Sequence, residues 1–188
     1  MHLPNGSYVT FGGSDATNGT ATPDGRLGVR IVNPCTISDN LSDGKCKWFE
    51  DPTQLAMKKQ RWYSTAEATG EGRIVIIGGM VKGGYINRVL PNVDPATEGG
   101  LAEPTYEYFP PMDGDPQVLQ FVVKTSGLNA FPHTFLMPSG KMLLQANLST
   151  SKSHLLLRFD PAKAVSAADC REDLPQFQLP AAVGGSAA

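Results

Sequence analysis

One strand-and-turn unit recurs three times along the chain, and this recurrence constrains the fold more than any other feature of the sequence. Each copy places a turn glycine directly before a strand-like segment, in residues 5–13, 71–79 and 139–147. The anchor glycines stand at positions 6, 72 and 140, which are 66 and 68 residues apart. Spacing this regular is typical of a repeat architecture, in which each copy is one supersecondary unit.

The match between the copies extends beyond this turn and strand. An aromatic residue, Tyr63 or Phe131, stands nine residues before the anchor glycine of the second and third copies. A further strand that closes on a turn follows later in each unit, at residues 29–34, 106–110 and 155–161. Three or four short strands per unit predict a blade of a β-propeller.

The second strand of the unit ends in a glycine pair in two copies, at residues 12–13 and 78–79. Such pairs indicate backbone packed too closely for Cβ atoms. A diglycine strand end followed by further strands resembles the kelch repeat, whose usual period is about 50 residues. The copies in this chain would therefore carry long loops, at residues 14–27, 35–46 and 83–105.

We therefore predict an all-β fold over residues 1–161: a partial kelch-type β-propeller of about two to three blades of antiparallel sheets. A propeller usually closes with about 4 to 8 blades, so this ring is not expected to close. Residues 162–188 are expected to be weakly structured, with a disordered tail from about residue 180, where small residues dominate.

Charge and hydropathy argue against several classes of partner. The formal net charge is −2 and the Lys and Arg residues are scattered, so the chain offers no cationic surface for nucleic acid. No apolar run approaches the ~20 residues that span a bilayer, so we predict no membrane partner. No GxGxxG or GxSxG motif supports nucleotide binding or hydrolysis. We expect a monomer.

Four N-glycosylation sequons indicate the secretory pathway, at Asn5, Asn18, Asn40 and Asn147. Chance is the alternative, because turns favour Asn, Gly and Ser. The first residues, Met1-His2-Leu3-Pro4, show no signal peptide pattern, which conflicts with secretion. We predict an extracellular protein.

Cys35 and Cys46 bracket a polar segment, which predicts a surface loop closed by a disulfide. A bridge across so short a loop contributes about 2 to 3 kcal/mol to stability. A zinc site is disfavoured because no second Cys or His pair stands at ligand spacing. Cys170 is left over, either free or paired with a group outside this chain.

Four stretches of the chain resemble the N-terminal half of fungal glyoxal oxidases, at residues 61–65, 74–79, 104–110 and 131–140. The segment Asn33-Pro34-Cys35, with Cys46, adds to this resemblance, which covers most of residues 3–161. The strings Arg-Trp-Tyr and Tyr-Glu-Tyr-Phe-Pro, in this order, are its most specific part. Glyoxal oxidases are secreted copper radical oxidases related to galactose oxidase, and they are kelch propellers.

The resemblance implies a catalytic, cofactor-binding and metal-binding role for Tyr63. This residue corresponds to the tyrosine that becomes thioether-linked to a cysteine, ligates copper and carries a radical. Oxidising a small aldehyde to the acid removes two electrons, of which Cu(II) accepts one and the radical form of the modified phenol the other. Dioxygen then takes up both electrons and leaves as hydrogen peroxide. The alternative is that Tyr63 packs the blade, as Phe131 would at the same repeat position.

The other ligands of the resembled site are not found in this chain. The cysteine partner would precede Met1, and a Tyr-His pair and a distant His would follow Ala188. Cu(II) favours imidazole nitrogen and oxygen in a tetragonal set. His2, His133 and His154 do not stand at ligand spacing, so surface or packing roles are expected for them. We therefore expect the chain to be an inactive fragment of the enzyme.

Two other functions remain open. A kelch propeller can instead bind protein or glycan through its loops, with Tyr63 only a core residue. A decayed pseudoenzyme is the second alternative. A cysteine shortly before Met1, with Tyr-His and His downstream, would favour the oxidase over the binding module.

Overall fold

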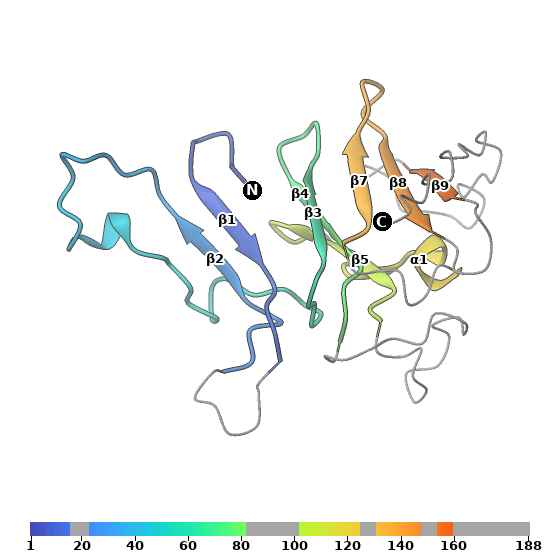
Figure 1. The fold of residues 1–188 in the computed structure, drawn as a ribbon, viewed down its shortest axis with the longest axis horizontal. Helices are drawn as coiled ribbons and strands as arrows, with labels where there is room; N and C mark the ends of the chain where they lie inside the picture. Colours follow the sequence, from blue (N-terminus) through green and yellow to red (C-terminus); the bar gives the residue numbers. More distant parts are fainter. Residues whose placement is uncertain (16–22, 82–101, 125–130, 148–153, 160–188) are drawn as a thin grey trace, which may run out of the picture.

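The computed structural model describes residues 1–15, 23–81, 102–124, 131–147 and 154–159 (Figure 1). Asn18, Cys170 and residues 162–188, for which predictions were made above, lie outside these ranges. Within them the protein consists of short strands, one α-helix, α1 (Gln120–Lys124), and one 3-10 helix, η1 (Gly44–Cys46). None of the helices in the described ranges is long and apolar enough to span a membrane.

The described strands form three separate antiparallel sheets that follow one another along the chain (Figure 1). The first pairs β1 (Tyr8–Phe11) with β2 (Val29–Val32). The second has the order β3 (Thr65–Ala68), β4 (Ile74–Ile77), β5 (Thr105–Phe109), β6 (Gln117–Val118). The third has the order β7 (His133–Leu136), β8 (Met142–Asn147), β9 (His154–Phe159).

The repeat seen in the sequence is a repeat of one hydrogen-bonded turn. In the second unit the N–H of Thr69 donates to the carbonyl of Arg73, and the N–H of Gly72 donates to the carbonyl of Thr69. The same two bonds recur from Leu3 and Gly6 in the first unit, and from Met137 and Gly140 in the third. The three anchor glycines have φ values of 83°, 80° and 76°, which a side chain would disfavour.

The middle sheet is covered on both faces by its neighbours, which explains the unbroken apolar run of β4. Ile74 and Ile76 pack in one core cluster with Val9 and Val29 of the first sheet. Val75 and Ile77 point to the other face, because side chains alternate along a strand. There they share a second cluster with Met142 and Leu144 of the third sheet, and with aromatic residues of β5.

This arrangement confirms the expected fold class. Each sheet is antiparallel, neighbouring sheets pack face to face, and the three sheets of the described residues do not close into a ring. The second sheet has the four strands of a complete blade, while the described strands of the others number two and three. The first strands of the second and third sheets, β3 and β7, lie beside each other (Figure 1).

The predicted disulfide between Cys35 and Cys46 is present, with the two Cα atoms 5.6 Å apart. It closes the loop that follows β2 and contains η1. In Figure 1 this loop extends from the first sheet on the side away from β3. The bridge therefore belongs to the periphery of the structure.

We expect Ile76→Ala to lower the free energy of unfolding by about 2–5 kcal/mol, because the side chain is buried between two sheets and its removal leaves a cavity. Val118→Ala, at a half-exposed position of β6, is the control and should cost less than about 0.5 kcal/mol. Urea denaturation followed by circular dichroism measures both. Equal effects would contradict face-to-face packing of the sheets.

Candidate functional site

Tyr63 lies at the entrance to β3, the strand that borders the third sheet. Just before it, Trp62 and Met80 exchange two backbone hydrogen bonds of 2.9 and 2.6 Å. The indole of Trp62 is stacked on the Tyr63 ring, with centroids 4.6 Å apart and an interplanar angle of 15°. The rings of Tyr63 and Phe131 meet in a T-shaped arrangement, with their centroids 5.0 Å apart. The side chain of Tyr63 is 38% exposed.

The backbone of Tyr63 is left-handed, with φ at 59°. Positive φ is unusual for a bulky residue and is held in place only by the surrounding structure. β3 begins at Thr65, after Tyr63, because a left-handed residue interrupts extended backbone.

Phe131 repeats this conformation one unit later, with φ at 51°. Its N–H donates to the carbonyl of Tyr63 at 2.8 Å, so the two left-handed aromatics are linked across neighbouring sheets. The conformation is therefore not particular to Tyr63. It marks the position just before the first strand of the second and third sheets, occupied by Tyr63 and Phe131, which we call the blade entrance. What distinguishes Tyr63 is the phenol hydroxyl and the stacked indole of Trp62.

Two glycine pairs make room for this backbone. A Cβ atom on Gly12, whose φ is 73°, would overlap the carbonyl oxygen of Arg61. A Cβ atom on Gly79, whose φ is 91°, would lie 2.9 Å from the carbonyl oxygen of Trp62. The close approach of backbone predicted from the diglycine strand ends is thus confirmed, and the approaching segment is the one that carries Tyr63.

Arg61 is fully buried, and its guanidinium holds the segment against β5. Nε donates to Glu107 Oε1 at 2.8 Å. Nη1 donates to the carbonyls of Gly78 and Thr105 at 2.7 and 2.9 Å, and Nη2 donates to Thr105 Oγ1 at 2.8 Å. A buried ion pair is tolerated when further hydrogen bonds satisfy both partners, as they do here.

Glu107 also holds the chain just before Arg61. Its Oε2 accepts the N–H of Lys58 at 2.6 Å, and its Oε1 accepts the N–H of Lys59 at 3.3 Å. Thr105 Oγ1, which accepts from Arg61, donates in turn to Glu103 Oε1 at 2.5 Å. Glu103, Thr105 and Glu107 were not among the site residues predicted from the sequence. The available signal was a glutamate between two strand aromatics, which needs a cationic partner when buried.

Two carboxyl groups of this region have shifted pKa values. Burial raises the pKa of Glu67 on β3 above its ordinary value. The side-chain hydrogen bond from Arg26 lowers the pKa of Asp24 to about 2. The backbone carbonyl of Arg26 accepts the N–H of Arg61 at 2.9 Å, so this ion pair borders the segment that leads to Tyr63.

The described residues do not complete a copper site around Tyr63. Among them there is no group of three or more His, Cys, Asp or Glu side chains that could hold a metal ion. His2 is exposed, with its ring centroid 5.0 Å from that of Tyr8, and His133 is exposed at the start of β7. His154 begins β9. One phenol does not supply the nitrogen and oxygen set that Cu(II) takes.

The predicted glycosylation residues fall in different settings. Asn5 and Asn40 are exposed, and each accepts the N–H of the sequon serine on its side-chain oxygen at 3.0 Å. Asn147 is the last residue of β8. None of these residues adjoins Tyr63 in the sequence.

No family model matches the chain. It is similar to a plant protein, aldehyde oxidase GLOX of Vitis pseudoreticulata, with 26% identity over 148 residues. The aligned part is 77% of this chain but 22% of the relative. The chain is thus distantly related to an aldehyde oxidase and spans about a fifth of its length. The relative is a plant protein, so the fungal grouping inferred from the sequence stays a prediction.

We expect Gly12→Ala to be more destabilising than Gly72→Ala, although both glycines have positive φ. Both variants pay the left-handed penalty of about 1–2 kcal/mol. Only a Cβ atom at Gly12 meets the Arg61 carbonyl, whereas none of the described atoms lies within 4 Å of one at Gly72. The overlap should cost a further ~1–3 kcal/mol in urea denaturation. Equal losses would show that the Arg61 carbonyl does not contact Gly12.

We expect Arg61→Met to lower the free energy of unfolding by about 3–5 kcal/mol, because it leaves the Glu107 carboxylate buried without its cation. Lys45→Met removes the cation of an exposed pair with Asp39 and should leave stability nearly unchanged. Thermal and urea denaturation of both variants provide the comparison. A mild effect of Arg61→Met would contradict the burial of this ion pair.

Proposed function

We propose that this chain is the N-terminal kelch portion of a glyoxal-oxidase-like copper radical oxidase, which converts a small aldehyde to the carboxylic acid and dioxygen to hydrogen peroxide. The observation that carries the proposal is the setting of Tyr63: a partly exposed phenol, stacked on Trp62 and fixed in a left-handed conformation. The distant relation to an aldehyde oxidase supports it.

The chain's own contribution is to hold the phenol in place. The Arg61 network fixes the backbone before Tyr63, and the hydrogen bond from Phe131 fixes the backbone after it. A side chain placed in this way loses little conformational freedom when a reaction begins. Copper, when bound in the complete enzyme, would accept one electron of the aldehyde oxidation.

The proposal places the remaining copper ligands outside the described residues, so we expect Tyr63 to hold copper only together with ligands from other parts of the enzyme. It also places the protein outside the cell, as a monomer. The Cys35–Cys46 disulfide supports an oxidising compartment, because such bridges are rare in reducing ones.

A binding module for protein or glycan is the second candidate. Phe131 favours it, because a residue without a hydroxyl adopts the same conformation at the same repeat position. In that case Tyr63 would serve only to pack the blade entrance, and its hydroxyl would have no role.

Peroxide release from methylglyoxal by the copper-loaded, full-length protein separates the two candidates. We expect Tyr63→Phe to abolish it, because this change removes the hydroxyl and keeps the ring that stacks on Trp62. Tyr8→Phe is the control, since Tyr8 is also 38% exposed but lies on β1. Full activity of Tyr63→Phe, or no peroxide from the parent protein, would contradict the proposal.

A further inference from the structure

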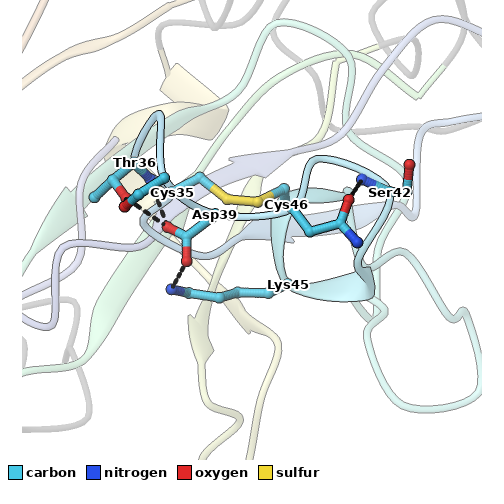
Figure 2. The surroundings of a disulfide bond; sticks show 8 residues. Cys35, Thr36, Asp39, Ser42, Lys45 and Cys46 are labelled. Carbon is cyan, nitrogen blue, oxygen red and sulfur yellow. Dashed lines mark hydrogen bonds and ion pairs between the residues drawn. A yellow bond between two sulfur atoms is a disulfide. The ribbon is translucent and has the colours of Figure 1, made fainter.

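The loop between Cys35 and Cys46 has a fixed shape. Asp39 Oδ2 accepts the N–H of Thr36 at 2.7 Å and its hydroxyl at 2.9 Å, and Oδ1 accepts Lys45 Nζ at 3.0 Å (Figure 2). The backbone hydrogen bond from Thr36, followed by the side-chain bond from Lys45, lowers the pKa of Asp39 to about 2. With the disulfide, these bonds hold the loop together at its two ends and its middle.

This fixed shape keeps two apolar side chains in water. Ile37 is fully exposed and Leu41 is 72% exposed. Single exposed apolar residues are ordinary on protein surfaces, but these two lie four positions apart on one short loop. Turning them inward would require breaking the bonds to Asp39 or the disulfide. In this conformation of the loop both side chains are exposed to water.

A glycosylation sequon lies at the same place. Asn40 is exposed, stands directly before Leu41, and is followed by Ser42 at the required position. Its Oδ1 accepts the N–H of Ser42 at 3.0 Å, and no hydrogen bond within the described part of the chain occupies Nδ2. The sequon at Asn5 is less accessible, because its serine, Ser7, is buried and donates its hydroxyl to Asn33 Oδ1 at 3.0 Å.

We propose that Asn40 carries an N-linked glycan that covers Ile37 and Leu41. The transfer joins Nδ2 to the anomeric carbon of the first N-acetylglucosamine and breaks the bond from that carbon to the pyrophosphate of a lipid-linked oligosaccharide donor. The amide nitrogen gives up one proton as the pyrophosphate leaves. Oligosaccharyl transfer and disulfide formation occur in the same secretory compartment. This inference is independent of the proposed oxidase function.

Glycopeptide mass spectrometry tests occupancy. The 188-residue chain is secreted from a eukaryotic host behind a cleavable signal, and the peptide that contains Asn40 is analysed before and after peptide-N-glycosidase treatment. We expect most molecules to carry sugar at Asn40 and the enzyme to convert this residue to Asp. Ser42→Ala should reduce occupancy to zero while Asn40 itself remains. An unmodified Asn40 in the secreted chain would overturn the proposal.

Binding of a fluorescent apolar dye tests the covering role. We expect enzymatic removal of the glycan from the folded protein to raise dye binding, and Ser42→Ala to raise it equally. Replacing Ile37 and Leu41 by Ser in the Ser42→Ala background should return the signal to that of the glycosylated parent. Dye binding that is unchanged by removal of the sugar, or that persists in the triple variant, would show that the glycan does not cover these side chains.

Discussion

The buried guanidinium of Arg61 is the interaction on which the placement of Tyr63 depends. It joins the segment before β3 to the third strand of the same sheet through Glu107 and Thr105. Glu107 also accepts the backbone N–H groups of Lys58 and Lys59, so a single carboxylate fixes both Arg61 and the chain just before it. Separating this pair would leave an unpaired buried charge, which is far more costly than losing a surface ion pair.

The face-to-face packing of the sheets gives this network its surroundings. β4 is buried on both faces, so each sheet depends on the next for the cover of its apolar side chains. At the blade entrance, successive units also contact one another through their backbones. Gly12 of the first unit packs against the carbonyl of Arg61 in the second unit. The carbonyl of Tyr63 in the second unit accepts the N–H of Phe131 in the third.

Much of this architecture could be predicted because it depends on residues that are close together in the sequence. The anchor glycines specify turns of positive φ, the apolar run of β4 specifies a strand buried on both faces, and the glycine pairs specify close backbone contact. The sequence indicated that a buried Glu107 needs a cation but not that Arg61 supplies it, since the two residues are 46 positions apart and meet only through the register of β4 and β5. The left-handed backbone of Tyr63 could not be predicted either, because Trp62 and Tyr63 are residue types that favour extended strands.

The central claim is that the phenol of Tyr63 is redox-active and not merely packed. Peptide mass spectrometry of the copper-treated, full-length protein tests it most directly, through the covalent link that an oxidised phenol forms with a cysteine thiol. The account predicts that the tryptic peptide of residues 62–73 is joined to a cysteine-containing peptide through Tyr63, with the loss of the two hydrogens that the bond replaces. Quantitative recovery of this peptide with an unmodified Tyr63 would contradict the account.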